Sequence, residues 1–278
     1  KKDSIYYLDE ALMMNSKYKK KSIYTQKTYV NVIKRFLKLL YNNMGDMSVY
    51  YLIQYLEEHR RLDLDSIDIK PLSYKDFMTV RNYLESQKPE RFFLDHTKTI
   101  EENKTEMFQS FIKMRNMMAL KLVVFAGIKS EEIKTLRING IKKLKKSYEF
   151  ELLIHRGKKK YEVRKTKMFM HHIRDEVLFL KQYFAAFGTP DNLIMVSSRN
   201  LEYSICNKDI SYFVSKFFEK TQVKIPSSSK VGFYLLRHSY GLYLAKNGKH
   251  IQTIRKKMGL VKTDMAKLYV AYLKTNNW

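Results

Sequence analysis

Apolar residues recur every three or four positions along most of this chain, and this spacing constrains the fold more than any other feature. Such spacing places apolar side chains on one face of an α-helix, whereas a strand requires alternation. The 278 residues include only nine glycines and four prolines, so few positions interrupt a helix. Residues 148–168 differ because they alternate and contain β-branched and aromatic residues, which predicts a hairpin with its turn near Gly157. The expected fold is mainly α-helical with a small antiparallel β-sheet.

The chain is strongly basic, with a net charge of +25 from 53 Lys and Arg residues against 28 Asp and Glu residues. A globular protein this basic attracts a polyanion, because each phosphate that it neutralises releases condensed counterions. The hydrophobic fraction of 45% is sufficient for a packed core and excludes a disordered basic tail. Charge alone is equally compatible with a ribosomal, nucleoid or membrane-surface protein, so the partner must be identified from particular residues.

Several other classes of protein are excluded by composition. No run of about 18 apolar residues is present, so no membrane-spanning helix is expected. The single cysteine, Cys206, rules out an internal disulfide and a cysteine-based zinc site, and it suits a reducing cytosol. The histidines lack metal-ligand spacing, so neither a metal nor another cofactor is expected. Among the partners that the charge allows we favour a nucleic acid, and we therefore expect a cytoplasmic, nucleoid-associated protein without a membrane partner or a small-molecule substrate.

A break in the helical pattern divides the chain. Residues 61–72 interrupt the apolar spacing, and Pro71 indicates an extended segment. We therefore expect a helical N-terminal domain over residues 1–66 and a larger domain over residues 67–278.

The larger domain begins with a helix start signal. Ser73 is placed as an N-cap and Asp76 completes a capping box, which predicts a helix to about Ser86. Residues 87–105 are polar and predict a loop.

The basic residues of the N-terminal domain gather around the start of a predicted helix, residues 23–42. They are Lys19, Lys20 and Lys21 before the helix, and Lys27 and Lys34 on its polar side. This pattern is typical of a solvated helix face, and it also suits contact with DNA phosphates. Both interpretations stay open on the sequence alone.

Residues 231–272 carry the strongest functional pattern. Arg237 and His238 open an amphipathic helix, a second basic helix ends at Gly259, and Tyr269 follows that glycine by ten residues. An arginine at a helix start near other cations is a good phosphate ligand. A tyrosine hydroxyl can act as a nucleophile when cations stabilise the charge that develops on its target.

The order and spacing of these residues resemble the C-terminal catalytic segment of the tyrosine recombinase (phage integrase, Xer-type) family, and the resemblance extends over about residues 18–272. Members of this family cut DNA with a tyrosine, which implies that Tyr269 is the nucleophile and Arg237 the second catalytic arginine. The resemblance also implies a small helical DNA-binding module before a mainly helical catalytic domain, closing as a clamp around duplex DNA. The N-terminal module of the family has four helices, more than the N-terminal part of this sequence predicts, so we expect further residues before Lys1.

Three positions depart from the family's catalytic set. Lys129 stands where the family has its first catalytic arginine, in a segment whose Glu132 matches the family's glutamate. Tyr234 replaces an acceptor residue that is usually histidine, and Leu260 replaces the histidine of the Leu-Gly-His motif. Lysine is a flexible point charge rather than a planar fork, and leucine can neither donate a hydrogen bond nor transfer a proton.

The predicted hairpin is rich in cations near its turn. The resemblance places a catalytic lysine at Gly157 or, with a shift of one residue, at Lys158, which makes Lys158 a candidate donor to the leaving-group oxygen. The hairpin can instead serve only to grip the DNA backbone. The further candidates for DNA contact are Arg156, Lys159, Lys160 and His238.

The resemblance leads to two functional hypotheses. One is an active recombinase or integrase that exchanges DNA strands through a 3′-phosphotyrosine at Tyr269. The other is an inactive protein of the same fold that binds DNA architecturally, or in the replication or segregation of a mobile element. Both imply double-stranded DNA as the partner and a homo-oligomer, a dimer or tetramer, on it. A basic helical RNA-binding protein is a third and more distant alternative.

Overall fold

The computed structural model describes residues 23–58, 71–155, 161–188, 193–197, 204–226, 231–276 and 278. Contacts between residues divide the chain into two units, residues 1–68 and 69–278, next to the boundary expected at residues 66 and 67. Each unit is described by itself.

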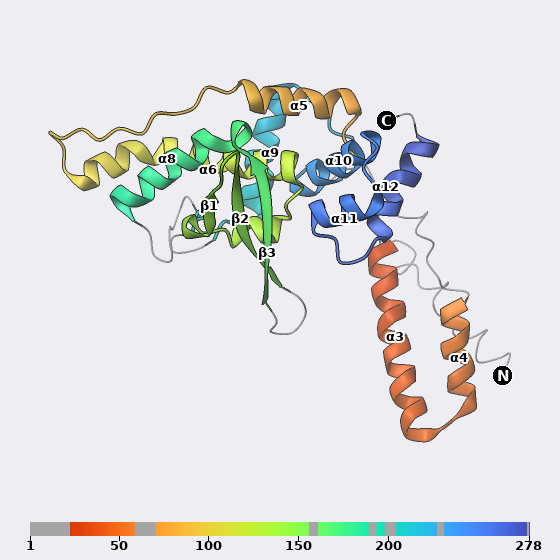
Figure 1. The fold of residues 1–278 in the computed structure, drawn as a ribbon. Helices are drawn as coiled ribbons and strands as arrows, with labels where there is room; N and C mark the ends of the chain where they lie inside the picture. Colours follow the sequence, from red (N-terminus) through yellow and green to blue (C-terminus); the bar gives the residue numbers. More distant parts are fainter. Residues whose placement is uncertain are drawn as a thin grey trace. The chain divides into compact units, whose positions relative to one another are not determined.

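The N-terminal unit contains a helical hairpin of α3 (Ile23–Met44) and α4 (Met47–Glu58) (Figure 1). Gly45 has a left-handed φ of 65°, which turns the chain between the two helices. The two helices pack through Val30, Leu37 and Ile53. Lys34, one of the expected DNA contacts, lies half-buried on α3.

The larger unit begins with α5 (Tyr74–Ser86), which starts as predicted because the Ser73 side chain accepts a hydrogen bond from the Asp76 backbone at 3.0 Å. The expected loop over residues 87–105 is partly wrong, since α6 (Ile100–Ala126) already begins at residue 100. Thr99 and Glu102 form a capping box there, in a polar segment that carries no apolar repeat.

The remaining elements follow in chain order. They are α7 (Ser130–Lys134), η2 (Ile138–Gly140), β1 (Ile141–Lys143), β2 (Ser147–His155), β3 (Tyr161–Phe169), α8 (Met170–Phe187), α9 (Asn207–Thr221), α10 (Phe233–Lys246), α11 (Ile251–Met258) and α12 (Asp264–Thr275). The strands form one antiparallel sheet in the order β1-β2-β3. The described residues thus confirm a mainly helical fold with a small antiparallel sheet.

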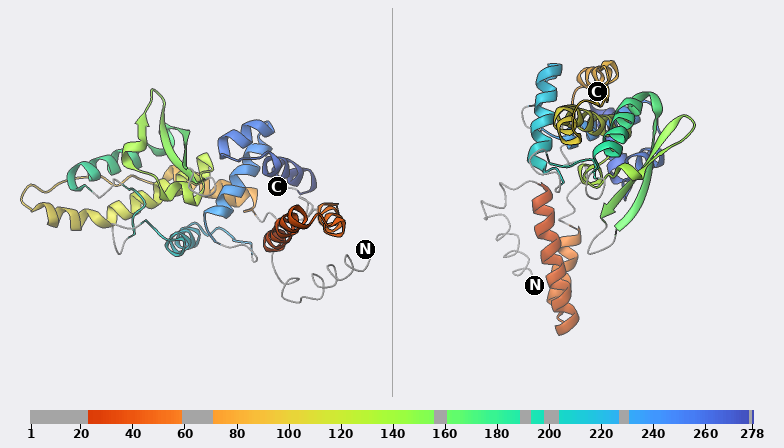
Figure 2. Two further views of the ribbon diagram at one scale, coloured as in Figure 1. Left: turned by 90° about the horizontal axis from the view of Figure 1, so that it is seen from below. Right: turned by 90° about the vertical axis from the view of Figure 1, so that its left-hand side faces the viewer.

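Helix α6 is the centre of the larger unit, because it packs against both α8 and α10. In the views of Figures 1 and 2, α6 and α8 run side by side, while α10, α11 and α12 gather near the C-terminus. The α6–α8 contact includes the rings of Phe111 and Tyr183, which stack with centroids 4.4 Å apart. Trp278 anchors the last residues, because its indole nitrogen donates to Leu72 O at 2.6 Å. Among the described helices, none has the length and apolarity needed to cross a bilayer.

A buried ion pair joins α6 to α8. Lys121 Nζ lies 2.5 Å from Glu176 Oε1, and the side chains are 9% and 5% exposed. Burial raises the pKa of the Glu176 carboxyl, and the positive charge of Lys121 opposes that rise. The mutual attraction of the two charges therefore offsets the cost of removing them from water. Loss of either side chain would leave the other charge buried without its partner.

We expect Lys121→Met to lower the free energy of unfolding by about 3–5 kcal/mol, because it leaves a buried carboxylate without its cation. Lys121→Met/Glu176→Gln removes both charges and should recover a large part of that loss. Urea denaturation followed by circular dichroism gives both values. A double variant no more stable than Lys121→Met would contradict this account of the pair.

Candidate functional site

Tyr269 lies in the interior, on α12 where it packs against α10. Its side chain is 1% exposed, and its hydroxyl lies 2.9 Å from Nδ1 of His238. Gly241 on α10 makes room for the ring, since a Cβ at that position would overlap the Tyr269 side chain. The hydroxyl that the family resemblance assigns as nucleophile is therefore held in one orientation and covered.

Arg237 also projects into the interior from α10 and is 7% exposed. Its guanidinium donates to the carbonyls of Gly127 and, at 2.6 Å, Met258. Burial lowers the pKa of this guanidinium, nearby Glu132 and Tyr269 oppose that effect, and nearby Arg164 adds to it. An arginine side chain keeps its proton at physiological pH. Within the described residues its hydrogen-bond partners are neutral carbonyls, so its charge is suited to an incoming anion.

His238, which the sequence suggested as a DNA contact, lies in the interior and is 5% exposed. Burial and the neighbouring Arg237 lower the pKa of His238 to about 3, so the ring is neutral at physiological pH. Its Nε2 atom is buried without a hydrogen-bond partner among the described residues. Every residue of α10 from 235 to 242 is buried, so Arg237 and His238 both face the interior although they are adjacent in sequence.

Lys129 and Glu132 lie at the start of α7, after the Gly127 turn. The Glu132 carboxylate accepts a hydrogen bond from the Lys129 backbone at 2.9 Å, and it is 2% exposed. The Lys129 side chain is half-buried. A Cβ at Gly127 would overlap Tyr240 on α10, so this glycine permits close packing of the turn against α10.

Arg164 on β3 joins this cluster, and the sequence patterns did not single it out. Its Nη1 atom donates to both carboxylate oxygens of Glu132, at 2.9 and 3.1 Å, and its Nη2 atom donates to Lys257 O. Strand alternation could have indicated it, because Arg164 shares a face with buried Met168 while Lys165 and Lys167 are exposed. An arginine on the inner face of a strand requires a buried partner.

The two other substituted positions lie around the same cluster. Tyr234 is 62% exposed, and its ring stands edge-on to the His238 ring with centroids 3.9 Å apart. Leu260 is half-buried, and its backbone N–H binds Arg255 O at 2.9 Å as part of the turn after α11. The structure thus gathers Arg237, Tyr269, Tyr234, Lys129 and Leu260 into one region of the larger unit.

The remaining sequence candidates are outside the described structure. Lys19, Lys20, Lys21, Arg156, Lys158, Lys159 and Lys160 lie outside the described residues, and of Lys27 only the backbone is described.

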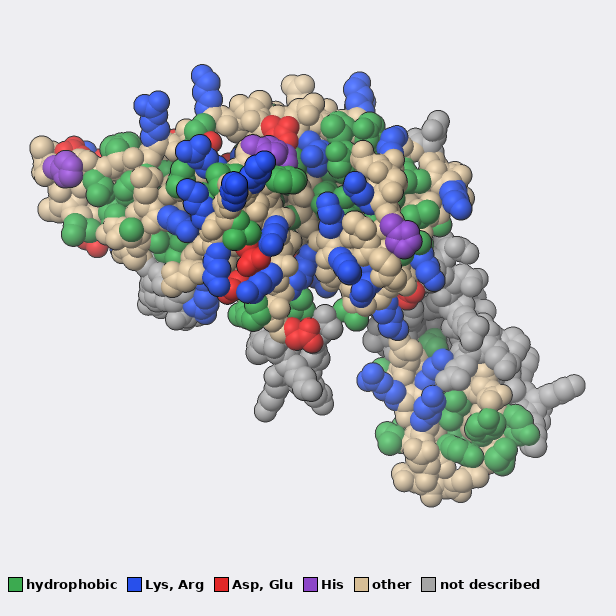
Figure 3. Space-filling model, in the orientation of Figure 1, with side chains coloured by type: hydrophobic (Ala, Val, Ile, Leu, Met, Phe, Trp, Pro, Cys, Tyr) green, Lys and Arg blue, Asp and Glu red, His purple; other side chains and the backbone are tan. Residues whose placement is uncertain are grey.

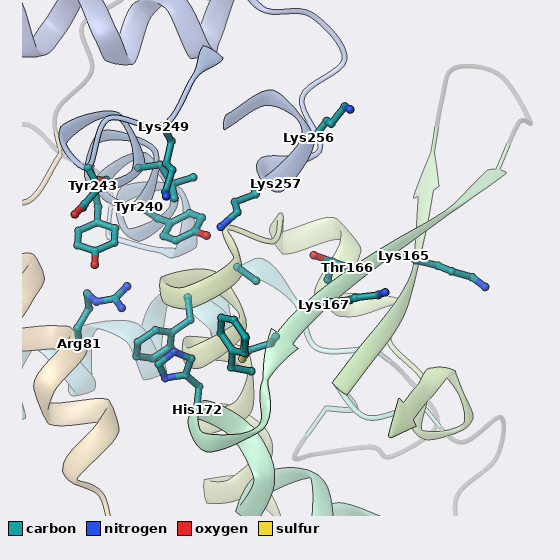
Figure 4. A pocket seen from close by; sticks show the side chains of 16 residues that line it. Arg81, Lys165, Thr166, Lys167, His172, Tyr240, Tyr243, Lys249, Lys256 and Lys257 are labelled. Atoms are coloured by element: carbon teal, nitrogen blue, oxygen red, sulfur yellow. The ribbon is translucent and has the colours of Figure 1, made fainter. Parts of the chain in front are cut away.

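A basic pocket of about 640 Å³ lies beside this cluster, between the end of α6, strand β3 and helices α5, α10 and α11. Six of the lining residues are cationic, namely Arg81, Lys165, Lys167, Lys249, Lys256 and Lys257. The described residues that line it include no Asp or Glu. Figure 4 shows Lys249, Lys257 and Tyr240 on one side and Thr166 and Lys167 on the strand opposite. Lysines and arginines also outnumber acidic side chains on the face seen in Figure 3. The pocket is suited to a phosphate-bearing ligand.

Comparison with known proteins shows the fold of the chain. No family model matches the sequence, and no curated protein matches it either. The crystal structure of XerH site-specific recombinase bound to palindromic difH substrate, a post-cleavage complex, is similar with a TM-score of 0.55 and 13% identity, covering 88% of this chain and 69% of that chain. The pre-cleavage complex of XerH with difH gives a TM-score of 0.55 and 12% identity, covering 88% and 67%. Over most of its length, the chain has the fold of tyrosine recombinases, as the sequence resemblance implied.

The depressed pKa of His238 makes stability depend on pH. Because the folded pKa of about 3 lies below the ordinary histidine value of 6.5, the unfolded chain binds more protons between these values. The contribution of neutral His238 to the stability of the folded protein is complete above pH 6.5 and is lost as the pH falls toward 3. Through His238, we expect the free energy of unfolding to fall by about 2 kcal/mol when the pH is lowered from roughly 7 to 5. Urea denaturation of His238→Asn should show a pH dependence flatter by that amount, and an unchanged dependence would rule out a buried neutral His238.

Proposed function

We propose that this protein binds double-stranded DNA and cleaves it through Tyr269, as a site-specific recombinase of the tyrosine type. The observation that carries the proposal is the pairing of a buried guanidinium, Arg237, with the buried hydroxyl of Tyr269 on neighbouring helices. The Arg237 guanidinium donates to neutral carbonyls, and nearby Glu132 offsets its positive charge only in part because Arg164 binds the same carboxylate, so the buried charge suits an anion. The XerH complexes with difH DNA, which share the fold, support DNA as the source of that anion.

The chemistry requires an attack by the Tyr269 oxygen on a DNA phosphorus, in line with the departing 5′ oxygen. The new bond is a 3′-phosphotyrosyl link, which conserves the energy of the broken ester and allows religation. Arg237 would stabilise the extra negative charge on the phosphoryl oxygens in the transition state. A hairpin lysine, Lys158 if the family motif is shifted by one residue, would protonate the 5′ oxygen.

The proton of Tyr269 has a defined first neighbour, the Nδ1 atom of His238. With a pKa of about 3, neutral His238 is a weak base while it is buried beside Arg237. A phosphate bound to Arg237 would offset that positive charge and raise the pKa of His238. Binding of DNA and activation of the tyrosine are coupled in this arrangement.

A second function, DNA binding without cleavage, is favoured by the same site. Tyr269 is 1% exposed, so its hydroxyl must be uncovered before it can reach DNA. Lys129 supplies a point charge where the family resemblance expects a planar fork. Both hypotheses include a homo-oligomer on DNA, which stays a prediction.

We expect wild-type protein to form a covalent adduct with nicked duplex DNA drawn from a random-sequence library, and Tyr269→Phe to form none. Adducts are recovered after denaturation in detergent, and the attached DNA is sequenced to identify the site. Tyr272→Phe, on the same helix, is the matched control and should retain the adduct. Binding of the library without any adduct would favour the non-cleaving alternative.

The basic pocket should contribute to DNA affinity through counterion release. Lys256→Ala/Lys257→Ala is expected to reduce the slope of log K against log salt concentration by about two, because each phosphate contact contributes about 0.9. Lys208→Ala/Lys224→Ala, which removes two exposed lysines near the ends of α9, is the matched control. Fluorescence anisotropy with a labelled duplex at several salt concentrations gives the slopes. Equal slopes for both double variants would show that the pocket lysines do not contact DNA phosphates.

A further inference from the structure

We propose that Arg164, projecting from β3, provides the second guanidinium of the phosphate-binding site, in place of the arginine that Lys129 replaces. The inference rests on the proposed function, because it names a further residue of the same site. Arg164 and Arg237 would bind one phosphate between them, next to the Tyr269 hydroxyl.

The first support is the position of the Arg164 guanidinium beside Glu132. This carboxylate also caps the backbone of Lys129, so it connects the two positions directly. The backbone N–H of residue 129 and the side chain of residue 164 therefore come from different elements and donate to the same carboxylate. Strand β3 thus brings a guanidinium to the carboxylate at the start of α7, where residue 129 itself is a lysine.

The second support is the convergence of Arg164 and Arg237 on one helix end. Arg164 donates to Lys257 O and Arg237 donates to Met258 O, two successive carbonyls at the end of α11. The two guanidinium groups are close enough for Arg164 to disfavour the charge on Arg237. Their repulsion is relieved when an anion binds between them, which is the electrostatic condition for a phosphate clamp.

The third support is the balance of charge among Arg164, Arg237 and Glu132. Arg164 and Arg237 carry two positive charges, and Glu132 is the carboxylate that both of them interact with. One positive charge therefore remains in a site where the two arginines are mostly buried, with 11% of the Arg164 side chain exposed. A phosphodiester carries the single negative charge that would complete this balance.

Gly259 maintains this geometry. It ends α11 with a left-handed φ of 59°, and a Cβ there would overlap the Arg164 guanidinium. The guanidinium lies flat over a position that only glycine leaves open. The Gly259 position of the recombinase-like motif therefore also serves to admit Arg164.

A purely structural role for Arg164 makes a different prediction. As a link between α7, β3 and α11, it would affect stability but not the binding of phosphate. Arg164→Lys separates the two roles, because lysine keeps a positive charge for Glu132 and loses the planar fork. Arg174→Lys, the same substitution on the exposed surface of α8, is the matched control.

The first experiment measures tungstate, a tetrahedral phosphate analogue, by isothermal titration calorimetry and in tungstate-soaked crystals. We expect one ion contacted by both Arg164 and Arg237, and an affinity at least about tenfold weaker in Arg164→Lys than in wild type or Arg174→Lys. An ion contacted by Arg237 alone, or an affinity unchanged by Arg164→Lys, would overturn the inference. This measurement does not depend on DNA cleavage.

The second experiment measures the single-turnover rate of adduct formation on the nicked DNA recovered from the library. Arg164→Lys should lower the rate by about 10²–10³, the usual loss for one transition-state donor. Adding Lys129→Arg to Arg164→Lys should restore at least tenfold of that loss, which a structural role for Arg164 would not produce. A wild-type rate in Arg164→Lys would refute the role of Arg164 in binding the phosphate, while cleavage by Tyr269 would still hold. If both arginines bind tungstate but no DNA adduct forms, the phosphate site formed by Arg164 and Arg237 would be supported and DNA cleavage would be refuted.

Discussion

The C-terminal end of α11 organises the site, because its last carbonyls bind side chains from two other elements. Arg237 on α10 and Arg164 on β3 donate to the Met258 and Lys257 carbonyls. The end of a helix carries partial negative charge, so cations are stabilised there. Gly259 turns the chain and leaves room for a guanidinium. The sheet, α10 and the start of the connection to α12 are fixed relative to one another by this one helix end.

The same arrangement places positive charge beside a covered tyrosine. Arg237 and Arg164 are held by backbone carbonyls and by Glu132 before any ligand arrives, so little reorganisation is needed when an anion binds. Tyr269 is oriented by His238 and packed against Gly241. The positive charges are therefore in position before a ligand binds, while the Tyr269 hydroxyl is buried. Exposure of this hydroxyl would distinguish a protein that cleaves DNA from one that only binds it.

Local patterns were sufficient for most elements and insufficient where burial depends on neighbours. The Ser73 cap, the 148–168 hairpin and the mainly helical fold were predicted from spacing and end signals. The start of α6 was missed because the Thr99 capping box lies in a polar segment. The burial of His238 was not predicted, because it depends on the neighbours that cover α10 on all sides between residues 235 and 242.

By itself, the sequence determined the elements, the charge, and the order and spacing of Arg237, Gly259 and Tyr269. These properties depend on residues close together in the chain, where helical periodicity and end signals act. Only the tertiary structure decided that Arg164 meets Glu132 and that Tyr269 is covered and bound to His238. Those contacts join residues far apart in sequence, and the packing of helices against each other and against the sheet, which no local pattern encodes, brings them together.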